Sequence, residues 1–264
     1  MDVTWFDANS WLIEAQGWRV LIDPWLVGDL VFGNMPWLVK GVRSVEIDIP
    51  RNIDLILLSQ GLADHAHPET LSVLDKSIPV VASPDAAKVA REAGYERVSV
   101  VAHGETAEET KANAAPLLIT ALQGAIVGPT KRENGYVLNF GSGSIQMYYE
   151  PHGYPDVERL KQIGAVDVVI TPLADITLAK VAPVVRGGDV AMQIAKLLRP
   201  QVMLPTAEAG QVNYDGVISG VLQTAGGAEA MRSRFQEEGL NTRVIQPTSG
   251  ETLGLDLRAS VAAG

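Results

Sequence analysis

The stretch SQGLADHAHPE at residues 59–69 decides the fold of this chain. It follows IDLILLS at residues 53–59, an almost wholly apolar run that is typical of a strand covered on both faces. A helix is predicted to begin near Pro68 and to end before Ile78. The polar residues between strand and helix therefore lie at the carboxyl end of a buried strand, where active sites of open α/β sheets gather.

Asp64 and His65 are adjacent in this strand-to-helix turn, so both side chains can point into one cleft. A carboxylate and a neutral imidazole are good ligands for zinc, iron or manganese. The alternative is a hydrogen-bonded pair that only fixes the turn. His67 faces elsewhere if the helix has begun, and we expect it to support the ligands from behind or to lie on the surface.

The rest of the chain alternates short strands with helices. In the first half, strands are expected at residues 3–6, 11–14, 18–22, 78–83, 98–101 and 117–121, and a helix at 85–93. The second half repeats this order, with strands at 135–140, 144–149, 167–171 and 201–204 and helices at 156–163 and 189–198. A third helix at 228–238 and edge strands at 244–245 and 253–257 complete the pattern.

This order favours a single domain over residues 1–264 with two pseudo-symmetric halves, about 1–121 and 122–257. The other interpretation is one mixed α/β sheet without internal symmetry, because such alternation is common in α/β proteins. The weakly patterned end, residues 258–264, is predicted to be a frayed tail.

The segment at 59–69 resembles the metallo-β-lactamase superfamily motif His-x-His-x-Asp-His, which holds two metal ions. The opening TWFDANSWLIEAQGWRVLIDPWL, residues 4–26, is similar to that superfamily's first hairpins and contains its Asp-Pro at Asp23-Pro24. GGDVAMQIAKLLRPQVMLPT, residues 187–206, resembles the branch related to ascorbate-6-phosphate lactonase. The resemblance, over about residues 3–210, implies a four-layer αβ/βα sandwich of two mixed β-sheets flanked by helices.

The motif departs from the superfamily pattern where the first metal would bind. Gln60 and Leu62 stand where the first two histidines belong, and Gln123 and no histidine follows the strand at 117–121. Leucine cannot coordinate a metal, and a neutral amide is a weak substitute for imidazole. The position of the final histidine holds Thr206.

The second metal position keeps Asp64 and His65, and His152 in the turn YEPHG, residues 149–153, can replace the bridging carboxylate. The resemblance therefore implies at most one divalent transition metal, namely zinc, iron or manganese, held by Asp64, His65 and His152. The alternative is that no metal is bound.

Further polar residues can reach the same cleft. Asp23 matches a superfamily position that orients histidine ligands. Glu150 is a candidate general base or ligand because Pro151 fixes the turn beside His152, and Gln60 is a candidate for positioning water or substrate. Together with Asp64 these form the candidate catalytic set. Each can equally be a group that stabilises a turn, as can the weaker candidates Asp175 and His103.

Composition excludes several classes of function. The chain has 31 acidic and 21 basic residues, a net charge of −10, and no Lys/Arg run longer than Lys131-Arg132, which disfavours nucleic acid and anionic membranes as partners. The absence of cysteine excludes disulfides and thiol catalysis. No secretory signal and no apolar stretch of about 20 residues is present, so we expect a cytoplasmic protein.

A dense group of large apolar residues runs from Trp25 to Val39, beside the expected mouth of the cleft. If these side chains are exposed, they mark a homo-oligomer contact first and a lid over a hydrophobic substrate second. Lipid contact is the weakest version, given the acidic charge. The alternative is that they pack inside the fold.

Two functions follow. The first is a metal-dependent hydrolase in which metal-activated water attacks an ester, lactone, amide or phosphoester. The second is a non-catalytic protein that keeps the fold and binds a small molecule or a protein partner in the cleft.

Overall fold

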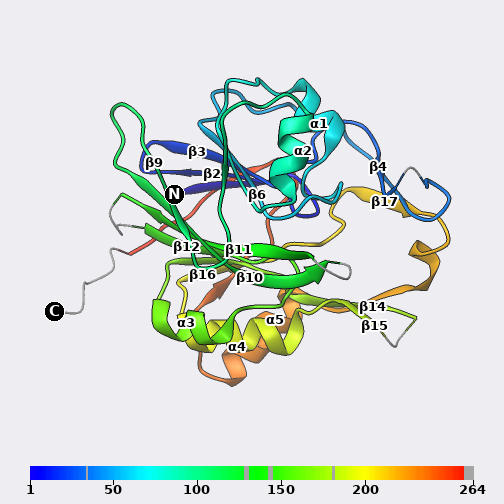
Figure 1. Cartoon of the computed structure of the whole chain (residues 1–264). Coiled ribbons are helices and arrows are strands. Elements are labelled where there is room, and N and C mark those ends of the chain that lie inside the picture. Colours follow the sequence, from blue (N-terminus) through cyan, green and yellow to red (C-terminus); the bar gives the residue numbers. More distant parts are fainter. Residues whose placement is uncertain (34, 128–130, 142–144, 180–181, 259–264) are drawn as a thin grey trace.

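Two large β-sheets stack face to face at the centre of the molecule, and helices cover their outer faces (Figure 1). The computed structural model describes residues 1–33, 35–127, 131–141, 145–179 and 182–258. Within these residues each large sheet has seven strands.

The first sheet has the strand order β20-β1-β2-β3-β6-β7-β8. Its strands are β1 (Asp2–Trp5), β2 (Trp11–Ala15), β3 (Trp18–Ile22), β6 (Leu55–Leu58), β7 (Val80–Ala82), β8 (Val98–Val100) and β20 (Thr252–Gly254). Strands β3, β6, β7 and β8 are parallel neighbours. The helices α1 (Pro68–Val73) and α2 (Ala86–Glu92) pack on the outer face through an apolar cluster that includes Leu71, Ala87 and Ile56.

The second sheet has the order β19-β16-β13-β12-β11-β10-β9. Its strands are β9 (Thr106–Glu109), β10 (Leu117–Val127), β11 (Lys131–Phe140), β12 (Ile145–Tyr149), β13 (Val168–Ile170), β16 (Val202–Leu204) and β19 (Arg243–Val244). The helices α3 (Val157–Ile163), α4 (Gly188–Leu198) and α5 (Ala228–Glu237) cover its outer face. Asp156 caps α3 by accepting a hydrogen bond from the Arg159 amide, as the acidic start of the predicted helix suggests.

The main core lies between the sheets, where Trp11, Ile22 and Leu57 of the first sheet meet Tyr136 and Ile170 of the second. Residues Leu55–Leu58 are completely buried, because the core covers one face of β6 and the α1–α2 layer covers the other. The predicted four-layer arrangement of two mixed sheets flanked by helices is therefore confirmed.

The two sheets share a pattern of pairing. In each, an antiparallel pair (β2–β3 or β11–β12) is followed by three parallel neighbours. The chain changes sheets after β8, however, and not near residue 121. Residues 117–121 begin β10 of the second sheet because β10 pairs along β11, and β20 returns to pair with β1. Of the predicted tail, residues 259–264 lie outside the described part.

Two smaller sheets project from one end of the sandwich, at the right of Figure 1, and the sequence patterns did not predict them. One contains β14 (Ala174–Leu178), β15 (Ala182–Val185) and β18 (Leu222–Gly226). The other contains β4 (Leu30–Val31), β5 (Lys40–Arg43) and β17 (Val212–Asp215), and the short 3-10 helix η1 (Ser219–Val221) follows β17. Among the described helices, none is long and apolar enough to cross a membrane.

The sequence left open whether the apolar side chains from Trp25 to Val39 are exposed or packed inside the fold, and the structure shows some of each. Trp25, Leu26 and Leu30 are buried, whereas Met35 and Trp37 are exposed, with Trp37 at 63%. The Arg43 guanidinium lies 4.3 Å from the centre of the Trp25 ring. A homo-oligomer contact through this segment stays a prediction, and its exposed part is reduced to the residues around Trp37.

Candidate metal centre

Asp64, His65 and His152 come together from the two halves of the sandwich. Asp64 and His65 lie in the turn between β6 and α1, and His152 lies in the turn between β12 and α3. One ligand atom from each of the three side chains lies within 4.8 Å of the other two. The structure thus forms a three-residue cluster from the residues that the sequence proposed as ligands.

A buried carboxylate fixes the His65 ring from behind. The ring Nδ1 donates to Asp23 Oδ2 at 2.7 Å, and both side chains are fully buried. Asp23 also accepts hydrogen bonds from the Ser59 amide (2.7 Å), the Ser59 hydroxyl (2.5 Å) and the Tyr149 hydroxyl (2.6 Å). The backbone of Asp23 has φ of 43°, a left-handed conformation that aspartate tolerates better than most residues. This turn at the end of β3 aims the carboxylate at His65.

A second buried carboxylate, Glu133 on β11, holds the His152 ring. The ring Nδ1 donates to Glu133 Oε2 at 2.7 Å, and Glu133 also accepts from the Ala125 amide (3.0 Å) and from Gln60 Nε2 (3.2 Å). Sequence reasoning missed Glu133 because it began this strand at residue 135. Directly after Lys131-Arg132, Glu133 has the sequence pattern of an ordinary charged surface residue, so the sequence carried no signal for it.

These contacts fit a metal ion. A carboxylate on each Nδ1 fixes the tautomer in which Nε2 carries a lone pair, as is usual for histidine ligands. His65 Nε2 lies 3.2 Å from Asp64 Oδ2, so two acceptors face each other unless a cation lies between them. Two ligands on a tetrahedral zinc, each about 2.0–2.1 Å from the ion, lie about 3.3 Å apart. The match in spacing indicates that the cluster can accommodate a divalent metal.

Unsatisfied polar atoms beside the cluster support the same conclusion. Asp64 Oδ1 and Gln60 Oε1 are buried without a hydrogen-bond partner among the described residues. A buried acceptor left unpaired costs about 1–3 kcal/mol. A metal or a polar ligand from outside the chain would remove that cost.

The charges of the cluster are mutually supporting. Burial opposes ionisation of Asp64, but the neighbouring imidazoles outweigh it and lower the pKa of Asp64. Burial likewise opposes a charge on His65, yet Asp64 and Asp23 raise the pKa of His65 well above its ordinary value. For His152, Glu133 outweighs burial and raises the pKa. The shared space therefore favours a positive charge, which a proton or a metal ion can supply.

Gln60 and Glu150, two of the candidate catalytic residues, are buried and are not among the described residues that line the large cavity beside the cluster. Gln60 contacts Glu133, as above. Glu150 accepts hydrogen bonds from the amides of His152 (3.2 Å) and Gly153 (2.5 Å), and so holds its own turn. Burial and the charge of Glu133 raise the pKa of Glu150 to about 7.

The structure places His67 away from the cluster. It is the N-cap of α1, where its Nδ1 accepts a hydrogen bond from the Thr70 amide at 3.2 Å, and its Nε2 contacts the Asp29 carbonyl at 3.2 Å. His67 thus stabilises the start of the helix and does not support the ligands from behind. The reason is that the helix begins at Pro68, which turns the ring back onto α1.

Other sequence candidates also have local partners. Asp175 accepts from the Gly187 amide at 2.9 Å, and His103 contacts the Glu133 carbonyl at 3.0 Å. Thr206, at the place of the final histidine, donates to Asn9 Oδ1 at 3.2 Å. Asn9 Nδ2 lies 3.2 Å from His65 Nε2, so the hydroxyl reaches the cluster through Asn9. Leu62 is 43% exposed, and Gln123 is exposed on β10.

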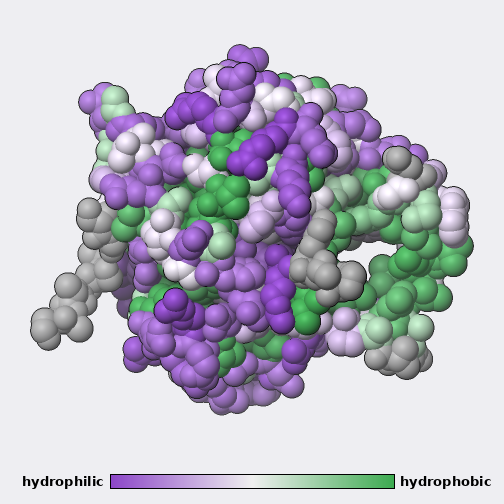
Figure 2. Space-filling view, in the orientation of Figure 1, coloured by the Kyte–Doolittle hydropathy of each residue, from purple (hydrophilic) through white to green (hydrophobic). Residues whose placement is uncertain are grey.

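The cluster opens into a cavity of about 1200 Å³. The polar part of its wall includes Asp64, His152, Asn9 and Thr206. Residues of both small sheets line the rest, and Phe32 and Val39 contribute from the apolar segment that begins at Trp25. Figure 2 shows hydrophobic side chains gathered over this part of the molecule, around a hollow. The small sheets therefore form the walls of the site.

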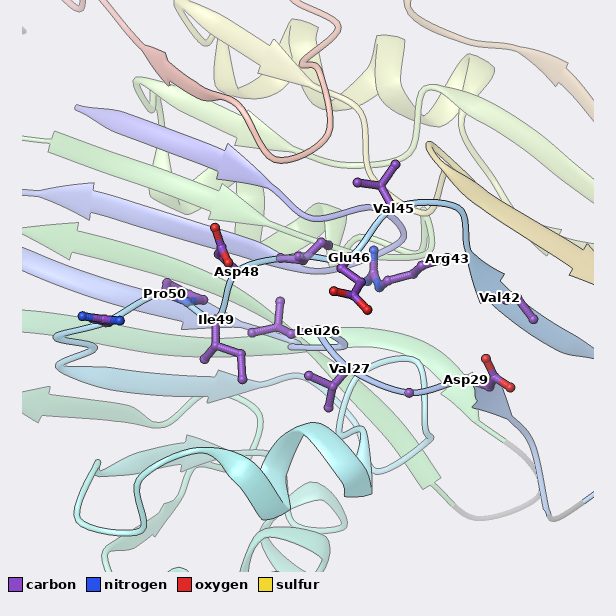
Figure 3. Close-up of a pocket in the computed structure, with 13 residues that line it drawn as sticks. Leu26, Val27, Asp29, Val42, Arg43, Val45, Glu46, Asp48, Ile49 and Pro50 are labelled. Atoms are coloured by element: carbon purple, nitrogen blue, oxygen red, sulfur yellow. The ribbon is translucent and has the colours of Figure 1, made fainter.

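A second cavity, of about 990 Å³, lies elsewhere (Figure 3). Figure 3 shows Leu26 and Val27 on one side and the loop that carries Val45, Asp48 and Pro50 on the other. Among the described residues that line it, none belongs to the metal-ligand cluster.

Stacked mixed sheets with a ligand cluster at their strand ends define a protein of the metallo-β-lactamase fold. A family model described as "Beta-lactamase superfamily domain" matches residues 2–207. The chain belongs to this family and so to the metallo-β-lactamase superfamily. The finer resemblance to the ascorbate-6-phosphate lactonase branch stays a prediction.

Individual relatives are distant. A UPF0173 metal-dependent hydrolase of Pyrobaculum neutrophilum is 23% identical over 213 residues, which cover 78% of this chain and 83% of the relative. An isothiocyanate hydrolase from Delia radicum gut bacteria is similar in structure with a TM-score of 0.65 and 16% identity, over 97% of this chain and 99% of the other. A metallo hydrolase from Ignicoccus hospitalis has a TM-score of 0.66 and 15% identity over the same shares. At these identities the solved structures indicate a shared fold.

Proposed function

We propose that this protein is a metal-dependent hydrolase with a single divalent transition metal held by Asp64, His65 and His152. The observation that carries the proposal is the pair of imidazoles, each with its Nδ1 on a buried carboxylate, that cluster with Asp64 so that one ligand atom of each residue lies within 4.8 Å of the others. Two histidines and one carboxylate suit zinc, iron or manganese. The name of the Pyrobaculum neutrophilum relative, a metal-dependent hydrolase, supports the same class of activity.

When bound, such a metal supplies Lewis-acid chemistry that polarises a carbonyl or phosphoryl group and acidifies water. The chain's own residues then have separate tasks. Asp23 and Glu133 hold the two rings in the ligating tautomer, and Gln60 positions Glu133. Asp64 lines the cavity and keeps Oδ1 free of described partners, so it can accept a proton from water. Glu150 contributes by holding the turn that presents His152.

The substrate in this proposal is an ester, lactone, amide or phosphoester whose reacting group lies against Asp64 and His152. Asn9 lies beside them on the cavity wall and offers an amide that can bind an oxygen of that group. Lactones are among the proposed substrates because the sequence resembles the ascorbate-6-phosphate lactonase branch.

Elemental analysis of protein purified without chelators tests the proposal. We expect about one transition metal per chain in the wild type, loss of that metal in His65→Ala and His152→Ala, and parallel loss of turnover on a panel of the four substrate types. His103→Ala is the matched control, because this exposed histidine contacts the backbone carbonyl of Glu133 and, among the described residues, none of the three proposed ligands. It should keep its metal.

Full activity in His65→Ala would refute this mechanism. Wild-type protein that neither contains nor binds zinc, iron or manganese would also refute it and would favour the non-catalytic binding protein.

A further inference from the structure

We propose that the large cavity binds an uncharged alkyl or acyl chain, so that the substrate is an amphiphile with its scissile acyl group at Asp64 and His152. The position of the scissile group rests on the proposed function. Binding of the chain itself depends only on the cavity walls and needs no metal.

One wall is a continuous face of the small β14–β15–β18 sheet. Ala174, Ile176 and Leu178 alternate along β14, and they pair with Gly226, Thr224 and Leu222 of β18. All six residues line the cavity. Because alternate residues of a strand point to one side, this whole face of the two strands turns toward the cavity. The wall is predominantly apolar.

The opposite wall comes from other parts of the chain and is also apolar. Phe32, Val39 and Ile218 line it, and Tyr214 of β17 joins them. Figure 2 shows the hydrophobic side chains of this region around the hollow. An apolar pocket with a few polar groups at one place is the usual form of a small-molecule site, and the polar groups orient the ligand. Here the polar place is the metal-ligand cluster.

The lining disfavours a negatively charged tail. Arg232 is paired with Glu229 through its guanidinium, and Glu208 accepts a hydrogen bond from Gln246. Among the described residues that line the cavity, Arg232 is the sole basic side chain apart from His152. The net charge of −10 adds a field that repels anions. An ester, lactone or amide with an apolar chain therefore fits better than a phosphoester.

The test measures binding to the metal-free protein in EDTA. The probe is 1-N-phenylnaphthylamine, an uncharged dye that fluoresces in apolar sites, and it is displaced by n-alkanols from butanol to decanol. We expect the Kd of the alkanol to fall about two- to fourfold for each added CH₂ group. Decyl phosphate should bind more weakly than decanol.

Three variants localise the binding to the wall. Leu178→Asp should weaken decanol binding at least about tenfold, because it places a charge in the apolar face. Val100→Asp is the control: Val100 is a strand valine, 42% exposed, and is not among the described lining residues. Thr224→Leu should strengthen decanol binding about threefold or more by adding apolar surface, and an unchanged near-ultraviolet circular dichroism spectrum distinguishes this gain from loosened packing.

An affinity that does not change with chain length, or equal losses in Leu178→Asp and Val100→Asp, would overturn the inference. So would decyl phosphate binding as tightly as decanol, or a stable dimer in sedimentation that excludes the dye. Chain-length-dependent binding without any metal or hydrolysis would support the inference while the proposed function fails. Hydrolysis of acyl esters at rates and KM values independent of chain length would support the proposed function and overturn the inference.

Discussion

His65 and His152 face the same shared space, but the two halves of the molecule fix them differently. On the first sheet, Asp23 accepts four hydrogen bonds and three of them converge on Oδ2, from Ser59, Tyr149 and His65. On the second sheet, Glu133 accepts from His152, Gln60 and the Ala125 amide. Asp23 therefore accepts four hydrogen bonds of 2.5–2.7 Å, whereas Glu133 accepts three of 2.7–3.2 Å.

Because of this difference, we expect Asp23 and Glu133 to contribute unequally to the stability of the fold and to metal binding. The Asp23 network joins β3, β6 and β12, so it ties the two sheets together. The Glu133 network lies on the long β10–β11 hairpin, where the register shifts between Gln123 and Ile126, and it reaches the first sheet through the longer, 3.2 Å contact of Gln60. Gly124 in this bulge leaves room for Glu133, since a Cβ on Gly124 would lie 2.5 Å from Glu133 Cγ. One carboxylate serves fold and site, and the other serves mainly the site.

Asp23→Asn should have the largest effect. At Oδ1 the new NH₂ would face the Ser59 amide, and at Oδ2 its two hydrogens could serve at most two of the three groups that now donate there, so we expect the free energy of unfolding to fall by about 3–5 kcal/mol. Metal affinity should fall about 10–100-fold, because His65 loses its orienting carboxylate. Urea denaturation and metal titration measure the two effects. Asp54→Ala, a half-buried carboxylate that pairs with Lys111 and accepts from the Arg19 amide at 2.8 Å, is the control and should cost about 1–2 kcal/mol.

If Asp23→Asn costs no more than Asp54→Ala, the Asp23 network does not join the two sheets in the way described above.

Glu133→Gln is the matched change on the second sheet and should cost less, about 1–2 kcal/mol. Gln60 can turn its amide to accept from the new NH₂, and His152 can change tautomer to do the same. In that tautomer Nε2 carries a hydrogen and cannot bind a metal, so we expect a loss of metal affinity at least as large as in Asp23→Asn. The same two measurements apply. A stability loss larger than that of Asp23→Asn would reverse the proposed division between the two networks.

Much of the fold was predictable because its pattern is local. The run at 53–59 predicts a strand buried on both faces, and Leu55–Leu58 are completely buried. The small sheets were not predictable, because their strands are short and pair across long separations. Residues 40–43 pair with 212–215, and residues 174–178 pair with 222–226. Nothing within such a strand indicates its partner.

The three clustered residues and the Asp23 carboxylate behind His65 could be proposed from the sequence, but Glu133 behind His152 could not. The order Asp64-His65 and the turn at His152 gave the three clustered residues. Glu133 was missed because burial of a carboxylate on an apolar strand depends on a histidine 19 residues away. His67 was expected to support the ligands from behind or to lie on the surface, but it is buried and caps α1, because the helix begins at Pro68.

Tyr149→Phe should give the smallest effect and sharpen the comparison further. It removes one of the four donors to Asp23, the 2.6 Å hydroxyl contact, and keeps the ring in the inter-sheet core. Because three donors remain, we expect a loss of about 0.5–1.5 kcal/mol in unfolding free energy and an unchanged metal stoichiometry. Tyr154→Phe is the control, because its hydroxyl makes an exposed contact of 3.4 Å, and it should change stability by less than about 0.5 kcal/mol. Loss of the metal in Tyr149→Phe would mean that the three remaining hydrogen bonds cannot keep Asp23 in place. The His65 ring would then be fixed no more firmly than the His152 ring.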